Sequence, residues 1–409
     1  MAIISVKKAH ETIRRSIKKT GCEEILLKEI SGRTLAKNIL ASFPQPRFDN
    51  SAMDGFAVRA EDTIEADNNS PIKLSLKGVI AAGETADFEI FSGECSQIMT
   101  GAKIPIGANA VIKVEETSGF QIKDSVKIFS EVKVGDNIRY QGEEISTGDT
   151  IIEAGTLLGP GEVGILASFG FNNIEVHRKP KISIFATGDE LVEPGLQLED
   201  GQIYNSNLPI FKELSQKMGA DIINTEILKD NKDSLTSFLS NSLKNSNLIV
   251  SSGGVSMGKH DYVRDVFLEL GVKEYFWRVA QKPGGPFFFG TKNDVMIFGL
   301  PGNPVSSFIC FMEYVWPAYE LMSGQNSMKK IIAVLDRSFP CDEFKHRFLT
   351  GVVHEHQGEL IATPSKKLGS HMLSSFLGSN AIIEAPPGQS SLDPGEPVTV
   401  SLLPWCDLH

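Results

Sequence analysis

Residues 247–270 read NLIVSSGGVSMGKHDYVRDVFLEL, and this stretch decides the fold class of the central part of the chain. The apolar run NLIVSS predicts a buried strand, the glycine-rich segment after it predicts a loop, and YVRDVFLEL has the apolar spacing of a helix. A strand, a loop and a helix in this order make up one half of a β–α–β unit. We therefore expect a parallel sheet with helices packed on it.

The same alternation extends on both sides of this stretch, from residue 181 to about residue 329. Strands are predicted at KISIFA (residues 181–186), DIINTEIL (221–228) and DVMIFGL (294–300), with helices between them. The last predicted helix runs from Val305 through Met322. This spacing indicates an open, largely parallel α/β sheet.

The regions outside this α/β segment have a different pattern. Residues 47–146 contain short alternating runs broken by Gly, Pro, Asp and Asn, which predicts a compact β-rich domain. From about residue 330 the helical period disappears, and runs such as AIIEAPP predict a C-terminal β domain.

The composition excludes several classes of partner and of site. With 41% hydrophobic and 22% charged residues, the 409-residue chain is typical of a globular protein of roughly three domains. A net charge of -11 provides no general positive field, so we expect neither nucleic acid nor membrane as a partner. The five cysteines are far apart and form no CxxC pair, which argues against a disulfide framework and a thiolate zinc site. Without a secretory h-region or a membrane-spanning run, the expected location is cytoplasmic.

Glycines and carboxylates follow the predicted strands of the α/β segment. Ligands of an open α/β sheet bind outside the carboxyl ends of its strands, so these residues are candidates for a site. Acidic helix caps explain one or two of the carboxylates but not the whole set. The segments are Thr187-Gly188-Asp189-Glu190, Lys229-Asp230, Gly253-Gly254-Val255-Ser256-Met257-Gly258-Lys259-His260-Asp261 and Pro301-Gly302-Asn303-Pro304.

The glycine-rich segment nearly matches a nucleotide-binding loop. Gly253, Gly258 and Lys259 have the spacing of GxxxxGK, but His260 stands where a P-loop needs Ser or Thr to hold magnesium. A looser hypothesis is that glycine N–H groups and the start of the next helix bind a phosphate. Asp261 either caps that helix or joins a set of oxygen ligands for Mg²⁺. This magnesium hypothesis names Asp189, Glu190, Asp230 and Asp261.

Three further segments combine turns with polar groups. RFDNSAMDGFAVR (residues 47–59) sets two carboxylates, an amide and a hydroxyl between two phenylalanines, and a turn without further function is its simplest interpretation. In KPGGP (282–286) a Lys stands beside a rigid turn, and in PGNPVSS (301–307) Ser306 follows a helix start where it could donate to an anion. A tight turn and a helix start alone also explain these two segments.

Six motifs, in their order and spacing, resemble the MoeA family of molybdopterin molybdenumtransferases, to which the gephyrin E domain also belongs. They are DNSAMDG, IMTGAKIP, TGDEL, SSGGVSMGKHD, KPGGP and GLPGNPVSS, and the resemblance covers nearly the whole chain. It implies four domains. These are an elongated discontinuous domain (1–46 and 147–180), a β-rich insertion (47–146), an open three-layer α/β domain like that of molybdopterin adenylyltransferases (181–329), and a C-terminal β-barrel-like domain (330–409).

The resemblance also implies an activity, its substrates and its residues. A family member would insert molybdate into adenylylated molybdopterin with the help of Mg²⁺, releasing AMP and molybdenum cofactor. The implied catalytic residues are Asp54, Thr100, Glu190, Asp230 and Asp261, and the implied metal ligands are Asp189, Glu190, Asp230 and Asp261. The implied substrate-binding residues are Ser252, Gly253, Gly254, Ser256, Gly258, Pro301, Gly302 and Asn303. The implied molybdate-binding residues are Lys282, Pro283, Ser306, Arg347 and Ser370.

Two positions depart from the family pattern. Gly285 in KPGGP stands where many members have Lys, so one cation near the anion site is missing, and Glu144 stands where Asp is commoner. No adenylyltransferase domain is fused to the chain, so a separate adenylyltransferase is an expected partner.

Family resemblance implies a homodimer with its active site between subunits. Asp54, Gly55 and Thr100 of one subunit would then face the α/β domain of the other, and Phe48 and Phe56 would anchor the loop that presents Asp54. Two other functions remain open. A nucleotide-dependent kinase predicts ATP hydrolysis without a pterin, and a non-catalytic scaffold of the gephyrin E-domain type predicts a groove that binds peptides.

Overall fold

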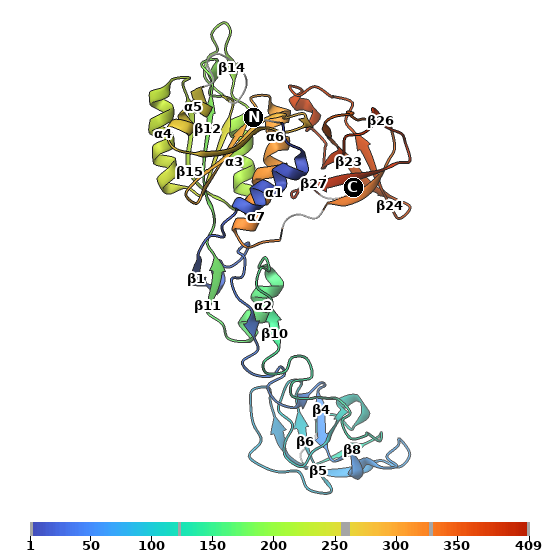
Figure 1. Ribbon diagram of the computed structural model, residues 1–409. Coiled ribbons are helices and arrows are strands. Elements are labelled where there is room, and N and C mark those ends of the chain that lie inside the picture. Colours follow the sequence, from blue (N-terminus) through green and yellow to red (C-terminus); the bar gives the residue numbers. More distant parts are fainter. Residues whose placement is uncertain (1–2, 122–123, 255–261, 327–329, 407–409) are drawn as a thin grey trace. The chain divides into compact units, whose positions relative to one another are not determined.

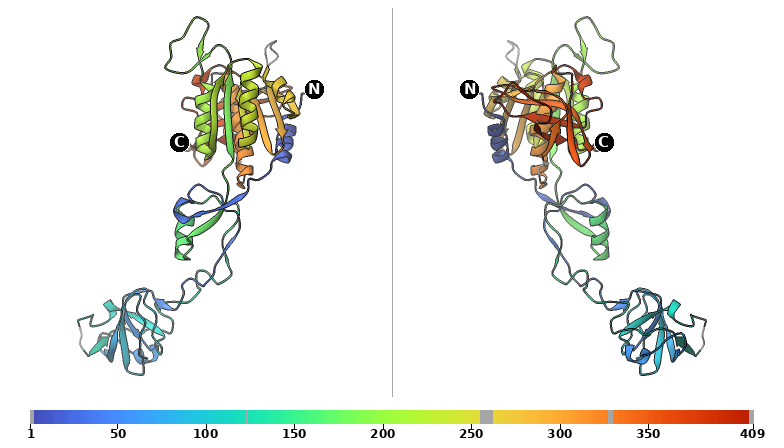
Figure 2. Two further views of the ribbon diagram at one scale, coloured as in Figure 1. Left: turned by 90° about the vertical axis from the view of Figure 1, so that its left-hand side faces the viewer. Right: turned by 90° about the vertical axis from the view of Figure 1, so that its right-hand side faces the viewer.

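The computed structural model describes residues 3–121, 124–254, 262–326 and 330–406 (Figure 1, Figure 2). It divides into two compact units. The first unit contains Met1–Ala36, Gly155–Pro160 and Asn173–His409, and the second contains Lys37–Ala154 and Gly161–Asn172. Among the helices of the described ranges, none has the length and apolar character needed to cross a membrane.

An α/β sheet forms the centre of the first unit. Its described strands are six, in the order β15–β12–β16–β20–β19–β17. The first four run parallel, as the sequence predicts, whereas β19 and β17 run antiparallel to their neighbours. A tight turn at Asn293 (φ 54°) joins β19 to β20, and such a short connection is compatible only with antiparallel pairing. The strands are β12 (Lys181–Thr187), β15 (Asp221–Leu228), β16 (Leu248–Ser252), β17 (Lys273–Arg278), β19 (Pro286–Lys292) and β20 (Val295–Leu300).

Helices cover both faces of this sheet (Figure 2). On one face α1, α3, α6 and α7 pack in a core that includes Phe211 and Phe298, and on the other face α4 and α5 pack around Phe185 and Phe267. The helix predicted from Val305 through Met322 is present, but a π-helical turn interrupts it. The helices are α1 (Val6–Ser16), α3 (Asn207–Met218), α4 (Lys232–Asn245), α5 (Tyr262–Glu269), α6 (Pro304–Cys310), the π turn η4 (Phe311–Val315) and α7 (Trp316–Met322).

Five of the described strands close into a barrel in the C-terminal region, which confirms the predicted barrel-like domain. β23 pairs with both β24 and β25, and the ring is completed through β21 and β27. The short strand β18 (Gln281–Lys282) extends this sheet by pairing with β23, with Lys282 opposite Arg347. The barrel strands are β21 (Ile331–Leu335), β23 (His346–His356), β24 (Glu359–Pro364), β25 (Ala381–Ala385) and β27 (Pro397–Leu402), beside the short pair β22 (Phe339–Pro340) and β26 (Ser391–Leu392).

Segments far apart in the sequence pair at two further places. In the first unit β1 (Cys22–Leu26) pairs antiparallel with β11 (Asn173–His177). In the second unit β2 (Ile39–Leu40) pairs with β10 (Thr150–Ile152), which α2 (Pro160–Ser168) follows. In each unit the chain therefore returns to an N-terminal segment after residue 146.

A β-sheet is the main element of the second unit. Its described strands have the order β7–β4–β6–β5–β8, and one apolar core around Phe56 and another around Ile98 pack on it. Gly55 in β4 is required by packing, because a Cβ there would lie 1.9 Å from the carbonyl oxygen of Ile112. The strands are β4 (Gly55–Val58), β5 (Ile72–Ile80), β6 (Glu94–Ile98), β7 (Ala110–Lys113) and β8 (Ser125–Ile128), with β3 (Asn50–Ser51) pairing with β9 (Ile138–Arg139).

Candidate functional site

A cavity of about 520 Å³ lies at the carboxyl ends of three parallel strands of the α/β sheet. Thr187 ends β12, Ser252 ends β16, and Pro301 follows β20. This is the place where an open α/β sheet binds ligands. The sequence candidates that line it are Thr187, Gly188, Glu190, Asp230, Ser252, Gly253, Gly254, Pro301, Gly302, Asn303 and Ser306, and the other lining residues are Leu191, Ile203, Asn207 and Pro286.

The buried side chain of Asn207, at the start of α3, connects two of these strand ends. Its amide nitrogen donates to Ser252 Oγ (2.6 Å) and to the Gly302 carbonyl oxygen (2.7 Å), and its oxygen accepts from Ser307 Oγ (3.4 Å). Asn207 therefore fixes the glycine loop after β16 against the turn after β20. The sequence alone predicts no role for Asn207 and so misses this residue.

The carboxylates near the cavity have different partners. Thr187 Oγ1 donates to Asp230, whose backbone N–H donates to Asp189 Oδ1 (3.3 Å). The Glu190 carboxylate lies over Gly188, where an added Cβ would be 2.7 Å from Glu190 Oε2. Within the ranges that the structure describes, no three His, Cys, Asp or Glu side chains converge as metal ligands. The predicted residues Ser256, Gly258 and Asp261 lie outside the described residues.

The predicted oxyanion residues Lys282 and Pro283 form a turn that packs against α6. An added Cβ at Gly284 (φ +87°) would be 2.6 Å from Cys310 Sγ and 3.4 Å from the Ser306 carbonyl oxygen. Since Ser306 also lines the strand-end cavity, the structure brings this turn to one side of the cavity. Glycine is required at residue 284, because both the positive φ and the close approach exclude a side chain.

The C-terminal domain contributes Ser370 to the same place. Its carbonyl oxygen accepts the N–H of Val305 (3.0 Å), and Asn303 Nδ2 donates to its Oγ (3.2 Å). Asn303 lines the cavity, and Val305 belongs to the first turn of α6. Ser370 therefore lies beside the turn that leads from β20 into α6.

Arg347 is a buried cation. The residue is 5% exposed, lies opposite Lys282 in the β18–β23 pair, and has no hydrogen-bond partner for its Nε. Burial lowers the pKa of Arg347, against the effect of nearby Asp342, but a guanidinium stays protonated at neutral pH. A buried donor without an acceptor is costly, so the Nε–H of Arg347 indicates a place for an anion.

In the second unit, Asp54 is held by Thr100. The backbone N–H and the hydroxyl of Thr100 both donate to Asp54 Oδ1, at 2.7 and 2.8 Å. These two bonds lower the pKa of the exposed Asp54 carboxyl. Phe56 is fully buried, but Phe48 is 39% exposed, so the expectation that both phenylalanines anchor the loop is wrong for Phe48. Phe48 lies outside the sheet, whereas Phe56 is in β4 between two paired strands.

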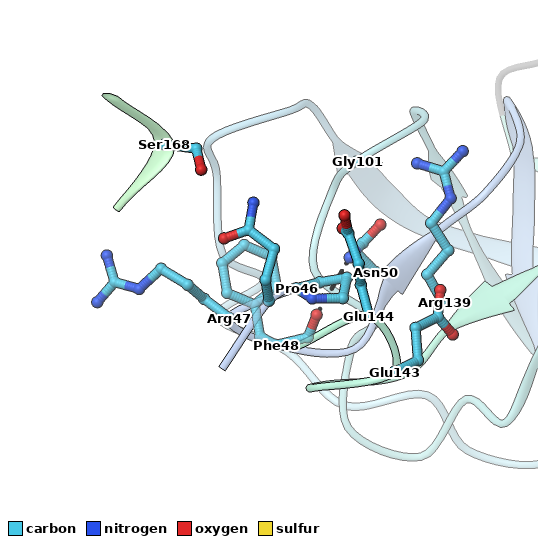
Figure 3. Close-up of a pocket in the computed structure, with 10 residues that line it drawn as sticks. Pro46, Arg47, Phe48, Asn50, Gly101, Arg139, Glu143, Glu144 and Ser168 are labelled. Carbon is cyan, nitrogen blue, oxygen red and sulfur yellow. Dashed lines mark hydrogen bonds between the residues drawn. The ribbon is translucent and has the colours of Figure 1, made fainter. Parts of the chain in front are cut away.

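A larger cavity, of about 870 Å³, lies next to this loop (Figure 3). Arg47 and Arg139 contribute cations, and Glu143 and Glu144 contribute carboxylates. The charges of this lining therefore balance, in contrast to the turn beside Arg347. The other lining residues are Gln45, Pro46, Phe48, Asn50, Gly101 and Ser168, and Asn50 donates to the Phe48 carbonyl oxygen at 3.1 Å.

Comparison with known proteins identifies the family. Residues 4–170 match the MoeA N-terminal region, residues 183–320 a probable molybdopterin-binding domain, and residues 333–403 the MoeA C-terminal region. The molybdopterin molybdenumtransferase of Haemophilus influenzae is 35% identical over 386 residues, which are 93% of this chain and 94% of that protein. The chain belongs to the MoeA family. The protein of the same name from Bacillus subtilis is 34% identical over 93% of this chain and 90% of that protein.

The fold agrees with this MoeA membership over the whole chain. The structure of the molybdopterin biosynthesis MoeA protein from Pyrococcus horikoshii superposes with a TM-score of 0.83 at 31% identity, covering 98% of this chain and 100% of that one. Asp54 and Thr100 lie in the matched N-terminal region, the strand-end cavity in the matched molybdopterin-binding domain, and Arg347 in the matched C-terminal region.

Proposed function

We propose that this MoeA-family chain is a molybdopterin molybdenumtransferase, which inserts molybdate into adenylylated molybdopterin and releases AMP. The observation that carries the proposal is the contact between two kinds of site. A strand-end cavity lined by carboxylates and glycines meets, at Ser306, a turn that stands opposite the buried Arg347, whose Nε has no hydrogen-bond partner. Two anionic substrates, a phosphate linkage and an oxyanion, suit this combination.

The glycine loop and Asn303 are assigned to the pterin substrate. Gly253 and Gly254 line the cavity, and backbone N–H groups of such a loop bind phosphate oxygens. Because the Gly253 N–H donates to the Leu300 carbonyl oxygen (3.1 Å), the Gly254 N–H is the one assigned to the phosphate. Asn207 fixes this loop against Gly302, so the phosphate-binding groups are held in place before the substrate arrives. Glu190 and Asp230 would orient the oxygen that attacks the scissile phosphate.

Glu190 and Asp230 also fit a magnesium ion. Mg²⁺ in proteins is commonly held by one or two carboxylates together with substrate phosphate oxygens, and these two carboxylates line the cavity. When bound, the ion neutralises charge on the phosphate group. Asp189, and Asp261 outside the described residues, remain candidates for the same role.

Lys282, Pro283, Ser306, Arg347 and Ser370 are assigned to molybdate. Lys282 and Arg347 supply positive charge to a dianion on an acidic protein, and the serine hydroxyls supply donors. The unsatisfied Nε of Arg347 is the strongest support, because an oxyanion is the partner that a buried guanidinium lacks.

The proposal includes the partners implied by the family resemblance. A homodimer would complete the site by bringing Asp54 and Thr100 of one subunit to the α/β domain of the other. A separate adenylyltransferase would supply the adenylylated pterin. The protein would bind both of its substrates in the cytoplasm.

The decisive experiment measures AMP. Purified protein is incubated with adenylylated molybdopterin, Mg²⁺ and molybdate, with sulfate as the control dianion. We expect AMP release that depends on molybdate and not on sulfate. Absence of molybdate-dependent AMP would overturn the proposal, and ATP hydrolysis without pterin would favour a kinase instead.

A further inference from the structure

One face of the last helical run contacts the segment 281–285, which contains the turn, through three residues spaced by four. Ser306 and Cys310, in α6, approach Gly284 through a carbonyl oxygen and a sulfur atom. Tyr314, in the π turn, donates its hydroxyl hydrogen to Gln281 Oε1. Residues at this spacing lie on the same side of a helix, so the turn rests on one continuous surface.

The side chain of Gln281 connects the turn to this helix. Gln281 is 2% exposed, and its amide nitrogen donates to the Pro283 carbonyl oxygen (3.1 Å) and contacts Cys310 Sγ (3.4 Å). Its oxygen is the acceptor for Tyr314. One buried amide therefore holds the backbone of the turn, the end of α6 and the π turn at once.

Tyr314 is itself rigid and neutral. It is 1% exposed, with its ring 4.6 Å from Phe287 and 4.9 Å from His10 between ring centroids. Burial holds the pKa of Tyr314 well above its ordinary value, so the hydroxyl remains a hydrogen-bond donor at neutral pH. The π turn that carries it is a type of helix irregularity found frequently at functional sites.

We infer that Gln281 is a positioning residue for oxyanion binding, and that Tyr314 acts with it. Neither residue touches the anion in this scheme. Gln281 fixes the Pro283 carbonyl group and thereby the direction in which the adjacent Lys282 leaves the backbone, relative to Ser306. The inference rests on the proposed function, because it assigns Lys282 and Ser306 to molybdate.

The alternative is that the Gln281–Tyr314 pair only stabilises the fold. A cycle of three variants distinguishes this structural role from the positioning role. Gln281→Met keeps the side-chain volume but removes donor and acceptor, and Tyr314→Phe removes the hydroxyl alone. Each single variant leaves a buried polar group without its partner, whereas the double variant removes both partners and should recover stability. Tyr319→Phe is the control, because Tyr319 is 3% exposed in α7 of the same helical run and its hydroxyl lies beside Gly219.

Two Michaelis constants and the melting temperature are measured for each variant. We expect both single variants and the double variant to raise KM for molybdate about tenfold, with KM for adenylylated molybdopterin changed less than about twofold. The double variant should melt at a higher temperature than the two single variants predict additively, yet keep its raised KM for molybdate. Tyr319→Phe should change the melting temperature only.

The inference is overturned if KM for molybdate recovers with stability in the double variant, or if both Michaelis constants rise equally. Equilibrium dialysis with molybdate alone provides a readout that is independent of turnover. Wild-type protein that binds molybdate without releasing AMP would contradict the proposed function but not the inference, provided Gln281→Met binds about tenfold more weakly. Wild-type protein that binds no molybdate would contradict both.

Discussion

Lys330, which precedes β21, donates to Glu313 at 2.9 Å, and Glu313 is 3% exposed on the π turn. The same ammonium group donates to Glu384 in β25 at 2.6 Å. One cation thus bridges two buried carboxylates, one from the α/β domain and one from the barrel. The helical run that supports the Lys282 turn is therefore joined to the barrel by charge as well as by packing.

Removing this cation should destabilise the first unit in a pH-dependent way. Burial acts to raise the pKa of Glu313, but the hydrogen bond from His10 and the charge of Lys330 outweigh it and lower the pKa to about 2. The stabilisation by ionised Glu313 is therefore complete above its ordinary pKa of 4.5 and is lost as pH falls toward 2. We expect Lys330→Met to cost about 3 kcal/mol at neutral pH, at the low end for a broken buried pair because Lys330 is 37% exposed.

Urea unfolding between pH 7 and pH 3 measures this effect. The cost of Lys330→Met should shrink as the solution becomes more acidic, because Glu313 is then protonated in the variant. Lys366→Met, at an exposed position, is the control and should cost nothing measurable. A cost that does not change with pH would show that packing, and not charge, links these elements.

Thr100→Val should shift the acid limb of the pH–rate profile to higher pH. The backbone N–H and the hydroxyl of Thr100 keep the pKa of Asp54 low, so ionised Asp54 persists to lower pH in the wild type. Without the hydroxyl, Asp54 is protonated at higher pH, and activity that needs the carboxylate falls there. Thr117→Val removes a comparable hydroxyl bond, to the Val114 carbonyl oxygen at 2.8 Å, and should leave the profile unchanged.

Mixing two inactive variants tests the expected dimer. Asp54→Ala and Asp261→Ala should each abolish turnover, because each removes one side of an intersubunit site. Subunit exchange makes about half of the dimers mixed, each with one intact site, so roughly a quarter of wild-type AMP release should return. If no AMP release returns after subunit exchange has been verified, Asp54 and Asp261 belong to the site of the same subunit, or Asp54 is only a turn residue.

Arg347→Met should weaken the use of molybdate far more than the use of the pterin substrate. A hydrogen bond to a charged group contributes about 1.5–3 kcal/mol, so KM for molybdate should rise about 10- to 100-fold. Arg337→Met is the control, because Arg337 is 41% exposed and pairs with Asp336. An equal rise of both Michaelis constants would contradict the assignment of Arg347 to the molybdate site.

Asn207→Ala should weaken the use of the pterin substrate far more than the use of molybdate, which is the reverse of the effect expected for Arg347→Met. It frees Ser252 and Gly302 from their common donor, so the phosphate-binding loop loses its fixed geometry. We expect KM for adenylylated molybdopterin to rise about tenfold while KM for molybdate stays constant. Asn241→Ala, on the exposed side of α4, controls for the loss of an amide. If the folded Asn207→Ala protein has unchanged kinetics, Asn207 has no role in holding the phosphate-binding loop.

The sequence predicts those features that repeat along the chain or occur at strand ends. Buried strands such as β16 and β20 are visible as apolar runs, and the order of a parallel sheet brings their ends to one cavity. The π turn in the last helix is not predictable this way, since its apolar residues fit an α-helix as well. Asn207 and Gln281 are also missed, because the sequence around an amide gives no sign of which distant groups its side chain will reach.

The pairing of β18 with β23 limits how this chain can be recombined. A fragment ending at residue 326 would leave Gln281 and Lys282 without the neighbouring strand that supports them in the intact chain. A chimera that takes residues 330–409 from another family member should take residues 281–285 from that member too. The reason is that β18, at the start of the second segment, pairs with β23 in the first. The barrel and residues 281–285 should therefore come from the same parent protein. In a chimera, the junction between the two parents is best placed before residue 281.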